Sequence, residues 1–126
     1  MERIALSPYN PRLGLNDVIV YDSTLRDGEQ TPGVAFTTEQ KVTIARMLDD
    51  AGVHQIEAGF PAVSENEVRT IRAIADLGLK AEILGLSRVT QGDIDAAVDA
   101  GVDLVLLFVG TSEIHLRYKM KKTQED

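Results

Sequence analysis

The sequence contains no cysteine, which excludes a disulfide framework, a thiolate zinc site and a cysteine nucleophile. It also lacks any apolar run near the roughly 18 residues that a membrane-spanning helix requires. The N-terminal segment has no long apolar stretch of the kind found in a secretory signal. Basic residues are scarce: 13 stand against 20 acidic ones, for a net charge of −7. This balance disfavours a general nucleic-acid or membrane-surface role. We therefore expect a cytoplasmic protein with no nucleic-acid or membrane partner.

What the chain does have is enough apolar material for one domain. Its 126 residues are 44% hydrophobic, which suffices for a core. Residues 1–17 contain Pro8 and Pro11 in a polar mixture and predict an extended leader. The domain itself is expected at residues 18–126.

Strand and helix patterns alternate along this domain. Residues 18–22 are apolar and rich in β-branched side chains, which predicts a buried strand. Further strands are predicted at 54–60, within 79–88 and at 102–110. Between them, capping-box patterns pair Thr37 with Gln40 and Ser64 with Glu67, and a third helix begins at Thr90 and Asp93. The residues expected to face inward from these helices are Ile44, Ala45, Leu48, Ala51, Val68, Ile71, Ile74, Ala75, Ile94, Ala97 and Val98. Thr123 resembles the start of a fourth helix.

Strands that alternate with helices predict βαβ units, a parallel sheet and right-handed crossovers. In such folds the functional face lies where the strands end. The opposite loops here are short glycine turns with little chemistry. The polar residues assigned to the strand ends are Asp22, Thr24, Arg26, Asp27, Glu29, Gln30, His54, Glu57, Ser87, Arg88, Thr111, Ser112, Glu113, His115, Arg117, Tyr118 and Lys119.

Each of these groups also has a structural interpretation. Arg26 and Asp27 could be a surface ion pair, and Glu57 could be an outward-facing or ion-paired carboxylate. His115 could be a surface histidine, and the basic residues 117–122 a solvated lead-in to a helix. Glu65 and Glu67 are interpreted as capping and solvent charges. It is the gathering of so many polar groups at one face that favours a site.

The residues after the first strand suit a particular chemistry. Mg²⁺ and Mn²⁺ prefer oxygen ligands, and Asp27 could supply one. Arg26 beside it could hold a carboxylate or stabilise an enolate oxygen. A cation and an arginine at one point suit the activation of a 2-oxo acid.

Four segments carry a family resemblance: D-S-T-L-R-D-G-E-Q-T-P-G-V at 22–34, I-E-A-G-F-P at 56–61, G-L-S-R at 85–88 and T-S-E-I-H-L-R-Y-K-M-K-K-T at 111–123. Together they resemble the acetyl-CoA-dependent 2-oxo-acid condensing enzymes: 2-isopropylmalate, citramalate and homocitrate synthases, which are related to hydroxymethylglutaryl-CoA lyases. The resemblance implies a TIM (β/α)₈ barrel of class α/β, of which this chain is the first half with four βα units. It also implies a divalent metal, Mg²⁺ or Mn²⁺ with Zn²⁺ as an alternative, and acetyl-CoA as co-substrate.

The resemblance assigns roles residue by residue. Asp27 matches a metal ligand, and Arg26 matches the catalytic arginine that contacts the 2-oxo acid. The remaining substrate-binding positions are Gln30, Glu57, Arg88, Thr111 and Ser112. A homodimer is expected for the parent enzyme.

The departures from the family are also informative. The His-x-His pair that completes the metal site is absent, and a whole barrel needs roughly 250 residues. We therefore expect the chain alone to be inactive, and unstable unless another chain or a copy of itself covers the sheet edges. Leu106 stands where many 2-isopropylmalate synthases have histidine. We rank 2-isopropylmalate synthase, an enzyme of leucine biosynthesis, first. Homocitrate synthase, citramalate synthase, a lyase and a non-catalytic half-barrel module stay open.

Overall fold

The computed structural model describes residues 18–123 and 125, so the expected leader at 1–17 lies outside the described residues. The main elements, in chain order, are β1 (Tyr21–Asp22), α1 (Thr38–Asp50), β2 (Gln55–Gly59), α2 (Glu65–Ala75), β3 (Glu82–Arg88), α3 (Gln91–Asp99) and β4 (Leu104–Phe108). Three short helical segments accompany them: η1 (Gly28–Gln30), η2 (Pro61–Val63) and the π-helix η3 (His115–Met120). Among the described residues, no helix has the length and apolar composition needed to cross a bilayer.

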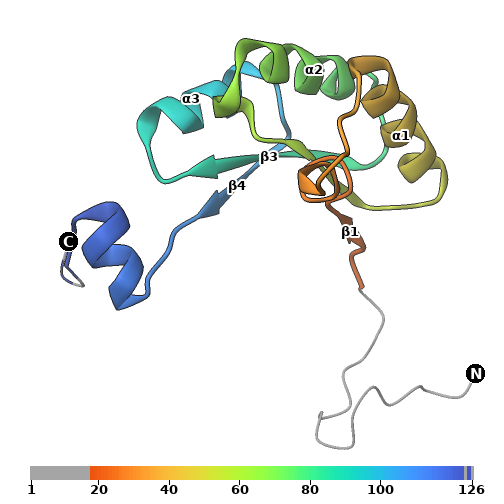
Figure 1. Cartoon of the computed structure of the whole chain (residues 1–126). Helices are drawn as coiled ribbons and strands as arrows, with labels where there is room; N and C mark the ends of the chain where they lie inside the picture. The colour runs from red at the N-terminus through yellow and green to blue at the C-terminus, as the bar shows by residue number, and fades with distance from the viewer. Residues whose placement is uncertain (1–17, 124, 126) are drawn as a thin grey trace, which may run out of the picture.

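The four strands form one parallel sheet in the order β1-β2-β3-β4. Figure 1 shows α1, α2 and α3 on the same side of this sheet. In a doubly wound sheet the helices cover both faces, whereas in a (β/α)₈ barrel they form one outer layer. The predicted arrangement of four parallel βα units from a barrel is therefore confirmed.

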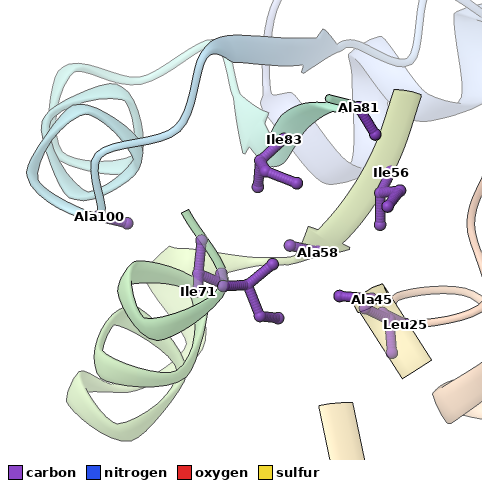
Figure 2. Packing of buried hydrophobic residues seen from close by; sticks show 9 residues of the cluster. Leu25, Ala45, Ile56, Ala58, Ile71, Ala81, Ile83 and Ala100 are labelled. Carbon is purple, nitrogen blue, oxygen red and sulfur yellow. The ribbon is translucent and has the colours of Figure 1, made fainter. Parts of the chain in front are cut away.

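The hydrophobic core lies between the sheet and the helices (Figure 2). Isoleucine and alanine dominate it, and β2 contributes Ile56 and Ala58, which alternate along the strand and so share one face. The buried cluster consists of Leu25, Ala45, Ile56, Ala58, Ile71, Ile74, Ala81, Ile83 and Ala100. Leu25 belongs to the turn after β1, so packing of the core also anchors that turn.

Only one of the two predicted capping boxes forms. The Thr37 side chain accepts from the Gln40 N–H, and the Gln40 side chain accepts from the Thr37 N–H. Ser64 accepts from the Glu67 N–H at 3.1 Å, but the Glu67 carboxylate binds Lys41 instead of reaching back to Ser64. The second box was therefore wrong, because a buried ammonium group competes for the carboxylate.

The outer strands are more exposed than the sequence suggested. The strand predicted at 18–22 forms only at Tyr21–Asp22, and Val18 and Ile19 before it are 58% and 62% exposed, so its predicted start and burial were wrong. Leu107 in β4 is 51% exposed. Each outer strand has a single neighbour within the described residues, which leaves one edge and part of its side chains uncovered.

Two residues that we expected to face inward, Val98 and Ala51, are exposed. Val98 of α3 is 62% exposed, since no helix packs on its far side in the described part of the chain. Ala51 ends α1 as its C-cap and is exposed. The helix expected from Thr123 would run through positions 124 and 126, outside the described residues, while η3 places helical structure earlier, at His115–Met120.

Candidate active site

A tight turn after β1 presents the first candidate residues. The carbonyl of Ser23 accepts from the N–H groups of Arg26, Asp27 and Gly28 at 3.1, 2.8 and 3.2 Å. Asp22 stabilises the entry to this turn, because its carboxylate accepts from both the N–H and the hydroxyl of Thr24. The turn directs the side chain of Leu25 into the core and leaves the side chains of Arg26 and Asp27 at the end of the sheet.

Arg26 forms a two-point ion pair with Glu57 of β2. Its Nε donates to Glu57 Oε1 at 2.7 Å, and its Nη2 donates to Oε2 at 3.0 Å. Its Nη1 donates to Asp27 Oδ1 at 2.8 Å. The arginine thus joins Asp27, in the turn after β1, to Glu57 in the middle of β2, and the structure brings the three residues together.

The opposite charges of Arg26 and Glu57 stabilise each other. Glu57 is fully buried, and an unpaired carboxylate there would be costly. The hydrogen bond from Arg26 to Glu57 is the main cause that raises the pKa of Arg26, so the guanidinium stays charged. Burial, followed by a hydrogen bond to Glu57, raises the pKa of the Tyr21 hydroxyl well above its ordinary value. Three of the guanidinium N–H groups donate to Glu57 and Asp27, and the Tyr21 hydroxyl also interacts with the guanidinium.

Asp27 fits one oxygen ligand of a hard cation. Its side chain is 65% exposed, and its hydrogen bond to Arg26 uses Oδ1 only. Within residues 18–123 and 125, no three His, Asp or Glu side chains cluster closely enough to hold an ion. The described residues therefore do not form a complete metal site by themselves.

Arg88 lies at the end of β3, next to the end of β2, and makes a second two-point pair. Its Nε and Nη2 donate to Asp93 at 2.6 and 2.8 Å. Its guanidinium lies 5.8 Å from the centre of the Phe60 ring, and that ring meets Phe108 edge-on at 6.2 Å. The hydrogen bond from Arg88 lowers the pKa of Asp93 to about 2. This end of the sheet thus combines a cation with two aromatic rings.

The other predicted site residues are not joined to these pairs. Gln30 ends η1 with an exposed side chain, and Thr111 is exposed after β4. Ser112 Oγ lies 2.7 Å from His115 Nδ1 and accepts from the His115 N–H at 3.3 Å. Thr111 and Ser112 make no contact with Arg26 within the described residues, so their roles stay predictions.

His54 does not belong to the candidate site. It precedes β2, and its Nδ1 accepts from the Val20 N–H at 3.0 Å, at the opposite end of the sheet. Its placement near the functional end of the second strand was therefore wrong. It instead joins the start of β2 to the segment that leads into β1.

The sequence interpretation missed a buried cation beside the turn. Lys41 is 2% exposed and pairs with Glu29 at 2.6 Å and with Glu67 at 3.0 Å. Glu67 is therefore not a solvent charge. The signal was present in the helix pattern, because Lys41 precedes the buried Ala45 by four residues and so shares its face. Asp93, interpreted only as a helix-start residue, was likewise missed as the partner of Arg88.

The chain is similar to several known proteins. Residues 17–126 match the HMGL-like family. The chain is 54% identical over 122 residues to homocitrate synthase AksA of Methanocaldococcus jannaschii, which covers 97% of this chain and 30% of that protein. It is 60% identical over 109 residues to a probable 2-isopropylmalate synthase of Methanopyrus kandleri, with 86% and 22% covered. The crystal structure of HMG-CoA lyase from Bacillus subtilis superposes with a TM-score of 0.68 at 24% identity, covering 86% of this chain and 38% of that one. This chain thus spans less than a third of the length of these two synthases.

Proposed function

Because this chain belongs to the HMGL-like family, we propose that it forms the first four βα units of a metal-dependent acyltransferase that condenses acetyl-CoA with a 2-oxo acid. The observation that carries the proposal is the Arg26–Glu57 pair with Asp27 beside it, at the end of two adjacent parallel strands. The parent protein would act as a 2-isopropylmalate or homocitrate synthase, in keeping with the names of its relatives.

Arg26 would bind the substrate and the negative charge that develops on it. The N–H groups that Arg26 does not give to Glu57 or Asp27 can donate to a carboxylate or to the oxygen of a carbonyl under attack. Glu57 would hold the guanidinium in orientation and keep it charged, because its buried carboxylate accepts from both Nε and Nη2 of Arg26. The catalytic residue is thus anchored before the substrate arrives.

Asp27 would be one ligand of the divalent cation, Mg²⁺ or Mn²⁺ with Zn²⁺ as an alternative. Such an ion, when bound, polarises the carbonyl of a 2-oxo acid. The exposed Oδ2 side of Asp27 is the side available to the ion, because Oδ1 accepts from Arg26.

Gln30, Arg88, Thr111 and Ser112 would complete the substrate pocket. The cation of Arg88 suits a substrate with a second carboxylate, whereas Leu106, Phe60 and Phe108 suit an apolar side chain. Both 2-isopropylmalate and homocitrate synthase therefore stay in the proposal. We place the parent enzyme in the cytoplasm as a homodimer, following the family resemblance.

The test is a hybrid enzyme. Residues 18–123 replace the matching segment of the Methanocaldococcus jannaschii homocitrate synthase, and release of CoA from acetyl-CoA is measured with 2-oxoglutarate and with 2-oxoisovalerate. We expect Mn²⁺-dependent turnover that Arg26→Lys lowers about 10²–10³-fold in kcat, as loss of a transition-state donor does. Arg46→Lys, at an exposed arginine of α1, is the matched control and should retain activity. A folded hybrid without turnover on either acid contradicts the proposal.

A non-catalytic carboxylate-binding module is the second candidate, because the guanidinium of Arg26 can bind an anion without a metal ion. Calorimetry of the 126-residue chain separates the two. Weak binding of a 2-oxo acid that requires Mn²⁺ and is lost in Asp27→Ala supports the inherited site. Binding that needs Arg26 but is indifferent to Mn²⁺ and to Asp27→Ala supports the module.

A further inference from the structure

Lys41 carries a buried charge that the proposed chemistry does not use. It lies in the first turns of α1 with 2% of its surface exposed. Its Nζ lies 2.6 Å from Glu29 Oε2 and donates to Glu67 Oε1 and Oε2 at 3.0 and 3.1 Å. Two of the hydrogen bonds go to Glu67, and the Glu29 carboxylate adds a second negative charge at ion-pair distance. A buried lysine persists only with such pairing.

One carboxylate of this cluster belongs to the turn that carries Arg26 and Asp27. Glu29 is the middle residue of η1, which begins directly after Asp27. Its Oε2 meets Lys41, and its Oε1 accepts from the Phe36 N–H at 3.0 Å. The turn is therefore held from α1 on one side and from the segment that leads into α1 on the other.

The second carboxylate packs against the strand end that carries Glu57. A Cβ placed on Gly59 would overlap the Glu67 carboxylate. Gly59 follows Glu57 by two residues, at the point where the pairing of β2 with β3 changes register. The absence of a side chain at Gly59 thus lets Glu67 reach Lys41 across the end of β2.

We propose that Lys41, Glu29 and Glu67 form a positioning cluster that fixes the turn bearing Arg26 and Asp27 relative to the strand end bearing Glu57. The cluster joins the same two segments as the Arg26–Glu57 pair, from the helix side of the sheet. Lys41 is therefore a positioning residue and touches no substrate. That these segments are catalytic rests on the proposed function, whereas the positioning itself is measurable without any ligand.

The test uses the full 126-residue chain without metal or substrate. Glu29→Gln removes one charge but leaves Lys41 paired with Glu67, so the variant is expected to fold. Glu65→Gln, on α2 with its side chain 95% exposed, is the matched control. The first readout is the NMR signal of the Arg26 Nε–H, which reports its bond to Glu57. The second is hydrogen exchange of residues 26–36 against residues 82–88 of β3.

We expect Glu29→Gln to shift or broaden the Arg26 Nε–H signal and to speed exchange in 26–36 at least about tenfold, with β3 unchanged, as local opening does. Lys41→Met should do the same, and Lys41→Arg should restore the signal in part because it keeps the charge. The proposal is overturned if Glu29→Gln matches Glu65→Gln in both readouts. It is equally overturned if Glu29→Gln unfolds the chain or speeds exchange everywhere, which would make the cluster a general stability element. Neither result depends on the hybrid enzyme, whose inactivity would count against the function alone.

Discussion

The two ends of the sheet use their polar side chains differently. At the end where the strands finish, the charged side chains bond to one another, as Arg26 does with Glu57 and Arg88 does with Asp93. At the end where the strands start, Glu82 accepts from the Gln55 side chain, but other polar side chains bond to the backbone. Asp49 Oδ1 there accepts from two N–H groups, those of Lys80 and Ala81, at 2.8 Å each.

Two more residues at the starting end follow the same rule. Asp103 accepts from the Ile83 N–H at 2.8 Å, and His54 accepts from the Val20 N–H at 3.0 Å. A side chain that satisfies a backbone donor joins two chain segments and so holds the fold together. An arginine that is only partly used by a carboxylate keeps donors for a ligand. The comparison therefore separates residues that hold the fold from residues that can bind.

Breaking the Arg26–Glu57 pair should have the largest effect. Arg26→Met leaves Glu57 buried without a cationic partner, and we expect the free energy of unfolding to fall by about 3–5 kcal/mol. The double variant Arg26→Met/Glu57→Met should recover most of this loss, because it removes both charges from the interior. Urea unfolding measures both. Arg69→Met, at an exposed arginine, is the control and should change little. A double variant as unstable as the single one would contradict the assigned cause.

A methyl group at Gly59 should disturb the end of the sheet where the strands finish. Gly59→Ala forces the Glu67 carboxylate to move and also puts a side chain on backbone with φ +157°. Overpacking alone lowers the free energy of unfolding by about 1–3 kcal/mol. Gly92→Ala in α3 is the matched control, since nothing lies within 4 Å of its Cβ position. It should be neutral or slightly stabilising, by up to about 1 kcal/mol. Equal effects of the two substitutions in urea unfolding would show that the Glu67 contact does not matter.

Removal of the Asp49 carboxylate should sharpen the contrast between the ends. Asp49→Ala leaves two backbone N–H groups without their acceptor, and we expect a loss of about 1–2 kcal/mol in the free energy of unfolding. The Mn²⁺ affinity of the folded protein, followed by electron paramagnetic resonance, should stay unchanged. Asp27→Asn should give the reverse pattern, with affinity lost and stability retained. A drop in Mn²⁺ affinity in folded Asp49→Ala would remove the distinction between the ends.

The smallest effect concerns pH at the Arg88 pair. The pKa of Asp93 falls from its ordinary 3.8 to about 2, so the folded state favours the ionised carboxylate. Its contribution to stability is therefore complete above about pH 4 and is lost as the pH falls toward 2. A carbon-detected NMR titration of the Asp93 carboxyl group should give a midpoint near 2, and Arg88→Gln should raise it. A midpoint of 3.8 in the unmodified chain would show that the pair is not maintained.

The sequence pattern was most reliable where local chemistry decides the structure. The alternation of β-branched runs with amphipathic helices predicted the parallel βα units, and Thr37 with Gln40 predicted the start of α1. The same approach failed at Ser64 and Glu67, because Lys41, 26 residues away in the chain, takes the carboxylate. Local capping preferences cannot register such a competitor.

The candidate site divides in the same way. The adjacency of Arg26 and Asp27 follows from the chain itself, and the rule that parallel strands end together placed Glu57 near them. That Glu57 is fully buried and takes both Nε and Nη2 of Arg26 was not readable from the pattern. Burial depends on which elements cover a residue, and those elements come from distant parts of the chain.

By itself, then, the order of residues determined the kinds of elements, their parallel arrangement and the end at which polar groups gather, because hydrophobic period and helix capping act over a few residues. Only the tertiary structure decided which carboxylate each cation binds. Lys41 with Glu29 and Glu67, and Arg26 with Glu57, are pairs set by packing between elements, since a buried charge takes the partner that the fold brings within reach.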